Sequence, residues 1–137
     1  MLFHASCVSL GGNAVLILGA AGSGKSALAL QLMAFGAMLV ADDRTEVTVP
    51  DAWPVASAPA AIRGRIEVRG IGILSATPAP PAPIVLAVDL DKIETERLPP
   101  ERVTDILGCS IPLLHKIEGL HFASAILQYL KGGRAEV

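Results

Sequence analysis

Aromatic residues are scarce in this chain. Phe, Trp and Tyr make up 4% of its 137 residues, although 52% of the residues are hydrophobic. The core is therefore expected to be built from aliphatic side chains, and the chain is long enough to bury a sizeable one. This length suggests a single domain that covers residues 1–137.

An excess of positive charge is also missing. The formal net charge is −2, which argues against a nucleic-acid-binding protein that relies on phosphate contacts. The only cysteines are Cys7 and Cys109, and no C-x-x-C motif occurs, so we expect neither a disulfide framework nor a zinc site. Such cysteine usage fits the reducing cytoplasm.

Long hydrophobic runs are absent as well. No run approaches the roughly 20 residues that a membrane-spanning helix needs. The N-terminus has no basic segment, and the apolar residues 14–18 lead straight into a glycine-rich loop. We therefore expect no signal peptide, no membrane association and a cytoplasmic protein.

The order of the predicted elements indicates an α/β fold. Residues 8–10 and 14–18 are typical of two strands joined by a tight turn at Gly11 and Gly12. Further strands are predicted at 37–41, 44–49, 65–74 and 83–90, loops at 51–61 and 75–83, and helices at 26–35, 99–108 and 119–133. This order predicts a mixed β-sheet flanked by helices.

The most specific motif is GAAGSGKS, which fits the pattern G-x-x-x-x-G-K-S. A strand is predicted before it and a helix after it, as a phosphate-binding loop requires. Glycines let backbone N–H groups turn toward phosphate oxygens, and the helix N-terminus adds partial positive charge. Lys25 is expected to reach the β and γ phosphates, and Ser26 to bind Mg²⁺. The predicted nucleotide-binding residues are Gly19, Ala20, Ala21, Gly22, Ser23, Gly24, Lys25 and Ser26.

The loop alone leaves the class of protein open. A GTPase would carry N-K-x-D, whereas the nearest stretch, residues 90–93, lacks the Asn and the second Asp. A small-molecule kinase would have an arginine-bearing lid, and residues 51–65 have Arg63 and Arg65 only at their end. An ATPase needs an acid near its water, and residues 39–43 and 84–91 both end in acids. A non-catalytic nucleotide-binding regulatory module is a further alternative.

Two adjacent aspartates follow a predicted buried strand. Asp42 and Asp43 come 17 and 18 residues after Lys25, which suits one helix and a return strand beside the loop. Neighbouring like charges need compensation, which Mg²⁺, Lys25 and Arg44 would supply. Alternation at the strand end should direct the two carboxylates to opposite sides, so they should have different roles.

A second polar pattern lies in IEVRGIGIL, residues 66–74. Alternation places Glu67 and Arg69 on one face of a strand, and the flexible Gly70 and Gly72 follow. A carboxylate and a guanidinium on one face would suit a phosphate and metal site. A solvated strand face is the alternative interpretation.

Together these segments resemble the HPr kinase/phosphorylase family. The resemblance rests on His4-Ala5, the phosphate loop, LVADD at residues 39–43 and IEVRGIGI at residues 66–73, all in the family's order and spacing. It covers roughly residues 4–90. The chain looks like the short form of the family, which is the catalytic domain without the N-terminal domain of longer members.

The resemblance implies an ATP- and Mg²⁺-dependent serine kinase. Its substrate would be HPr, the small phosphocarrier of the sugar phosphotransferase system, or a close relative. Long members also run the reverse, phosphorylase reaction and form hexamers, so a homo-oligomer is expected. Asp43 would be the base that accepts the serine proton, and His4 the active-site histidine. Ser26 and Glu67 would be magnesium ligands. Apart from the resemblance, Asp42 is expected either to support the magnesium through a water or to hold the local backbone.

Two parts of the family's pattern have weaker counterparts here. Arg97 is the predicted catalytic arginine, with Arg102 as the alternative, and a solvated arginine is an equally valid interpretation of each. The glycine- and arginine-bearing loop linked to dephosphorylation would correspond to residues 110–119. His115 and Lys116 in that segment would contact phosphate or simply be solvated.

Overall fold

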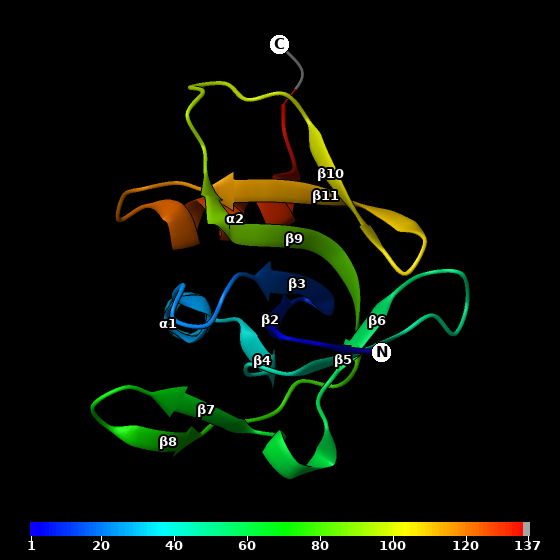
Figure 1. Cartoon of the computed structure of the whole chain (residues 1–137), viewed down its shortest axis with the longest axis vertical. Coiled ribbons are helices and arrows are strands. Elements are labelled where there is room, and N and C mark those ends of the chain that lie inside the picture. The colour runs from blue at the N-terminus through cyan, green and yellow to red at the C-terminus, as the bar shows by residue number, and fades with distance from the viewer. Residues whose placement is uncertain (136–137) are drawn as a thin grey trace.

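The computed structural model describes residues 1–135 and confirms the α/β class, with a mixed sheet and two helices (Figure 1). The strands are β1 (Leu2–Phe3), β2 (Ala5–Leu10), β3 (Asn13–Leu18), β4 (Met38–Ala41), β5 (Thr45–Thr48), β6 (Val55–Ser57), β7 (Arg65–Val68), β8 (Gly72–Ser75), β9 (Ala82–Ile93), β10 (Arg102–Ile106) and β11 (Cys109–Lys116). The helices are α1 (Lys25–Ala34) and α2 (Phe122–Gly132), with a 3₁₀ turn, η1 (Ala60–Ile62). No helix among these residues is long and apolar enough to cross a membrane.

The long strand β9 is the centre of the main sheet. Its first residues pair with β6, and the rest pairs in parallel with β3 on one side and β11 on the other. The order continues from β3 through β2 to β4, and from β6 through β5 to β1. In Figure 1 the β10–β11 pair and the β7–β8 pair lie at opposite ends of the molecule.

Both helices cover the same face of the sheet. Along β3, Val15 and Ile17 belong to the cluster that contains Leu32 of α1 and Ile126 of α2. The alternate residues of β3 contact a second cluster, which includes Val47 of β5, Ala56 of β6 and Ile111 of β11. The second face is therefore covered by the curled ends of the sheet itself. Both clusters are mainly aliphatic, as the composition predicts.

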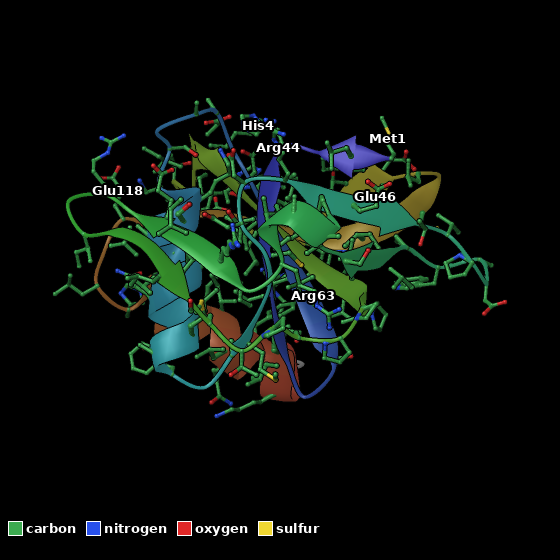
Figure 2. The ribbon with its side chains drawn as sticks, turned by 90° about the horizontal axis from the view of Figure 1, so that it is seen from below. Met1, His4, Arg44, Glu46, Arg63 and Glu118 are labelled. Carbon is green, nitrogen blue, oxygen red and sulfur yellow. The ribbon has the colours of Figure 1, made fainter. Side chains whose placement is uncertain are left out.

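The pairing of the strands gathers several chain segments at one edge of the sheet. Because β3 and β9 are parallel, Leu18 and Asp89 lie opposite each other at their ends. Because β2 runs antiparallel to β3 and β4, its first residues lie beside Leu18 and Ala41. The strand β1 pairs with β5, which brings His4 next to Arg44 (Figure 2).

The predicted helix at residues 99–108 is wrong. This segment contains β10, which pairs with β11, a strand that the sequence interpretation did not include. The prolines at 99 and 100 suggested a first helical turn, but Val103 pairs with Pro112 and Ile106 with Cys109 in an antiparallel ladder. A two-residue turn joins the strands, with Leu107 at φ 48° and Gly108 at φ 87°. Positive φ at both positions is typical of a hairpin turn.

Two other predictions need correction. Residues 51–61 are not all loop, because they contain β6 and η1. Residues 65–74 are not one interrupted strand but the β7–β8 hairpin, which forms a small sheet of its own. Arg69 and Gly70 lie in its turn, so Arg69 is outside the strand whose alternation was used to place it.

The packing of α1 against the sheet predicts the stability effect of Leu32→Ala. Leu32 is fully buried, so truncation should leave a cavity and lower the free energy of unfolding by about 2–5 kcal/mol. Chemical denaturation measures this change. The matched control is Leu98→Ala, because Leu98 is 80% exposed and its loss should cost less than about 0.5 kcal/mol. Equal effects of the two substitutions would contradict this packing.

Candidate functional site

A pocket of about 560 Å³ opens at the edge of the sheet where β1, β2, β3 and β4 bring their neighbouring loops together. Its volume is in the range of small-molecule binding sites. The residues that line it come from the glycine-rich loop, the start of α1, the segments after β1 and β4, and the β7–β8 hairpin. They are His4, Ala21, Gly22, Gly24, Lys25, Ser26, Ala27, Leu30, Asp43, Glu67, Val68 and Arg69.

The glycines of the loop are required by its backbone. Gly19 has φ 154°, and a Cβ there would collide with the Ser23 hydroxyl. Gly24 has φ 102° and begins α1 without any side-chain cap. The first N–H groups of α1 are therefore left for another partner. The Ser23 hydroxyl is buried and has no hydrogen-bond partner among the described residues.

The side chain of Lys25 is hydrogen-bonded to the first residues of its own loop. The residue is buried, and its ammonium group donates to the carbonyl of Gly19 at 2.8 Å and that of Ala20 at 3.0 Å. Lys25 forms no ion pair with Asp42 or Asp43. These contacts give no support to charge compensation by Lys25, which stays a prediction.

Asp91 anchors the beginning of the loop. The Ala20 N–H lies 3.1 Å and 3.0 Å from the two carboxylate oxygens of Asp91. The Asp91 N–H in turn donates to Asp89 Oδ1 at 2.9 Å. The sequence contained a signal for this contact, since residues 84–91 end in acids, but only the pairing of β9 with β3 identifies its partner.

Asp42 is a buried carboxylate that joins three elements. The hydroxyls of Ser6 on β2 and Ser26 on α1 donate to its Oδ1 at 3.0 Å and 2.5 Å. The N–H of Glu67 on β7 donates to Oδ2 at 3.0 Å. Only 8% of Asp42 is exposed, and hydrogen bonds to a charged acceptor are among the stronger ones in proteins. These three donors supply the compensation that the sequence analysis assigned to cations.

Asp43 has a different environment from its neighbour. Its side chain is 55% exposed, and its Oδ1 lies 2.9 Å from Nε2 of His4. The two aspartates do point apart, but strand alternation is not the cause, because β4 ends at Ala41. Asp43 has φ 65°, in the left-handed region. That turn of the backbone separates the two carboxylates.

The remaining predicted site residues fall into two groups. Glu67 and Arg69 line the pocket, and Gly70 and Gly72 follow them in the hairpin. Arg97, by contrast, lies exposed in the segment after β9 and does not line the pocket. Its predicted catalytic role has no support from this arrangement and stays a prediction.

Arg102, the alternative arginine, is held by acidic partners. It donates to both oxygens of Glu94 at 3.0 Å and lies 3.6 Å from Glu96. It lines a separate pocket of about 170 Å³, together with His115. The hydrogen bonds from Arg102 lower the pKa of Glu94 to about 2. This arginine therefore stabilises the segment between β9 and β10.

The mixed sheet and its strand–loop–helix unit define an α/β protein with a loop whose geometry is consistent with phosphate binding. The family model of the HPr Serine kinase C-terminal domain matches residues 1–114. The chain therefore belongs to this family, as the resemblance predicted. One solved structure, that of the Hpr(Ser) kinase/phosphatase from Coxiella burnetii, has the same fold. It matches with a TM-score of 0.80 and 24% identity over 96% of this chain and 88% of its own.

Curated relatives match a shorter segment. The HPr kinase/phosphorylase of Caldicellulosiruptor bescii is 49% identical over 72 residues, which are 52% of this chain and 23% of the relative. That of Lactococcus lactis subsp. lactis is 46% identical over 72 residues, with the same two shares of 52% and 23%. The matched segment thus spans less than a quarter of these relatives.

The Glu94–Arg102 pair predicts a pH dependence of stability. Because the pKa of Glu94 is lowered from 4.5 to about 2 in the folded state, its contribution is present above pH 4.5 and is lost as pH falls toward 2. Glu94→Gln should therefore flatten the decline in the unfolding midpoint across this window. Denaturation measured from pH 6 to pH 2 checks this. Parallel curves for the two proteins would contradict the contribution of this pair.

Proposed function

We propose that this chain is a kinase domain that transfers the γ-phosphoryl group of ATP to a serine of HPr or of a closely related carrier protein. The observation that carries the proposal is one pocket that combines the glycine-rich loop with the half-exposed carboxylate of Asp43. Family membership supports HPr as the acceptor, since the relatives carry the name HPr kinase/phosphorylase. Regulation of the phosphotransferase system is the corresponding physiological role.

The residues of the loop fit a nucleoside triphosphate. The first N–H groups of α1 have no side-chain cap and are donors that phosphate oxygens would accept from. The buried Lys25 would exchange its two carbonyl contacts for phosphate oxygens. These groups position the β and γ phosphates beside Asp43, and positioning is the main contribution of a protein to phosphoryl transfer.

A magnesium ion also fits this donor set. Ser26 donates its proton to Asp42, which leaves oxygen lone pairs of Ser26 free to face a cation. Glu67 lines the same pocket. Within residues 1–135 no group of three or more His, Cys, Asp or Glu side chains would hold a metal alone, and Mg²⁺ usually shares its coordination with waters and substrate phosphates. When bound, Mg²⁺ supplies charge neutralisation at the phosphates.

Asp43 is the proposed general base. A serine hydroxyl becomes a good nucleophile only when a group within about 3 Å accepts its proton. Asp43 lines the pocket, and its contact with Nε2 of His4 involves only Oδ1. The second carboxylate oxygen is thus available to the incoming hydroxyl, while His4 orients the group.

Arg69 takes the place of Arg97 in this proposal. Arg69 lines the pocket and Arg97 does not, so the proposal assigns the phosphates to Arg69. Asp42 supports the site indirectly, because it holds Ser26 and the β7–β8 hairpin. A single domain over residues 1–137, a cytoplasmic location and a homo-oligomer belong to the proposal through family membership.

The proposed acceptor predicts a direct outcome. Incubation with ATP, Mg²⁺ and purified HPr should produce HPr phosphorylated on one serine, located by mass spectrometry. HPr with that serine replaced by alanine is the control and should remain unlabelled. ATP hydrolysis without any label on HPr would contradict the proposal. Addition of inorganic phosphate to the phosphorylated HPr, with detection of pyrophosphate, tests the reverse reaction in the same preparation.

The proposed base predicts the effect of Asp43→Asn. The amide cannot accept the serine proton, so the rate of transfer should fall by about 10²–10⁴-fold. ATP binding, measured by calorimetry, should be nearly unchanged because Lys25 and the loop are untouched. Asp51→Asn is the matched control, since Asp51 is exposed and outside the pocket. Full transfer by the Asp43 variant would contradict the proposed role of Asp43 as the base.

A further inference from the structure

Ser6 is a buried polar residue that no sequence motif singled out. It lies on β2, is 0% exposed and does not line the pocket, so it cannot touch a bound substrate. A buried hydroxyl is costly unless it is hydrogen-bonded. Ser6 forms two bonds, both to the adjacent aspartates. It donates to Asp42 Oδ1 at 3.0 Å and accepts from the N–H of Asp43 at 3.1 Å.

We propose that Ser6 is a positioning residue that sets the direction of the Asp43 carboxylate for phosphoryl transfer. The proposal rests on the function proposed above. It goes further because it assigns the geometry of the base to a residue outside the pocket. A single hydroxyl on a rigid strand would determine how the two aspartates diverge.

The backbone of Asp43 explains why such a residue is needed. A non-glycine residue at φ 65° lies in a disfavoured region and persists there only when its surroundings hold it. Two hydrogen bonds lie at this turn. The Arg44 N–H donates to the Asp42 carbonyl at 2.7 Å within the turn itself, and the Asp43 N–H donates to Ser6 at 3.1 Å and ties the central residue to β2. The turn directs the Asp43 carboxylate to His4 and into the pocket wall. Without the bond to Ser6, the turn keeps its internal Arg44–Asp42 bond but loses the hydrogen bond that attaches Asp43 to the sheet.

The strand that carries Ser6 is suited to this role. Ser6 pairs with Ile17 in the ladder between β2 and β3, and Cys7 pairs with Ala41 at the end of β4. The position of the Ser6 hydroxyl is therefore determined by the centre of the sheet. Because the glycine-rich loop after β3 is attached to the same sheet, Ser6 keeps Asp43 at a fixed position relative to this loop.

The loss of the Ser6 hydroxyl should affect Asp43 more than Asp42. Asp42 also accepts from the Ser26 hydroxyl and the Glu67 N–H, so it keeps two donors when Ser6 is lost. The described structure shows no other acceptor for the Asp43 N–H. Removal of the hydroxyl should therefore disturb the base much more than the nucleotide loop.

The test combines Ser6→Ala with three further variants. Ser6→Cys keeps the side-chain size but provides only a weak donor and acceptor, and it replaces the alanine variant if that one does not fold. Ser6→Thr retains the hydroxyl and should restore activity. Ser9→Ala is the matched control, because Ser9 is buried on the same strand and pairs with Ala14 and Met38, away from the pocket.

Two readouts decide the proposal. In Ser6→Ala and Ser6→Cys, kcat for HPr phosphorylation should fall about tenfold or more while the KM for ATP changes less than about twofold. Amide hydrogen exchange at Asp43, followed by NMR, should accelerate about tenfold in the same variants. Neither quantity should change in Ser9→Ala, and Ser6→Thr should recover both.

The outcomes separate this proposal from the function on which it rests. Unchanged exchange at Asp43 in the Ser6 variants would overturn it, as would an equal loss of kcat and ATP affinity. Faster exchange with unchanged kcat would show that the bond exists but does not position the base, which also overturns it. If the unmodified protein transfers nothing to HPr, the proposed function fails, and the positioning proposal fails with it even if exchange shows the bond.

Discussion

The buried carboxylate of Asp42 is the interaction on which the arrangement of the site depends. Three donors from separate elements converge on it: Ser6 on β2, Ser26 on α1 and the Glu67 N–H on β7. A buried charge is tolerated only when such bonds satisfy it. The same bonds hold the start of the helix, the edge of the sheet and the small hairpin together, although these elements lie far apart in the chain. The pocket has a defined shape because the elements around it are held by hydrogen bonds to the Asp42 carboxylate.

The neighbouring Asp43 is attached to β2 through Ser6, but its carboxylate is half exposed rather than buried. Its left-handed backbone takes the carboxylate out of the buried network and leaves it half exposed beside His4. One member of the pair is thus buried and hydrogen-bonded, and the other is half exposed and lines the pocket. At the other end of the loop, Asp91 binds the Ala20 N–H from β9. Two carboxylates thus hold the ends of the glycine-rich loop: Asp91 on β9 binds Ala20, and Asp42, directly after β4, binds Ser26.

Most of the central fold could be predicted from the sequence, because its signals are local. Strands β2, β3, β4 and β9 are apolar runs, and α1 and α2 have helical periodicity. The helix predicted at residues 99–108 is wrong because the conformation of this segment depends on long-range pairing rather than on local signals. Pro99 and Pro100 suggested a helical start, but the partner strand β11 decides the conformation of β10 through long-range pairing. Residues 65–74 were also ambiguous, since glycines in a strand pattern indicate either an interruption or a turn.

The sequence by itself determined the loop motif, the pair of aspartates and the family, because each is a contiguous pattern whose chemistry does not depend on distant residues. Only the tertiary structure decided which groups compensate the aspartates. The expected groups were Mg²⁺, Lys25 and Arg44, whereas the described donors to Asp42 are two serines and a backbone N–H. It also decided that Arg69 lies at the pocket and Arg97 does not. These outcomes depend on which strands pair and where they end, and a hydroxyl such as that of Ser6 acquires its role only through its neighbours in space.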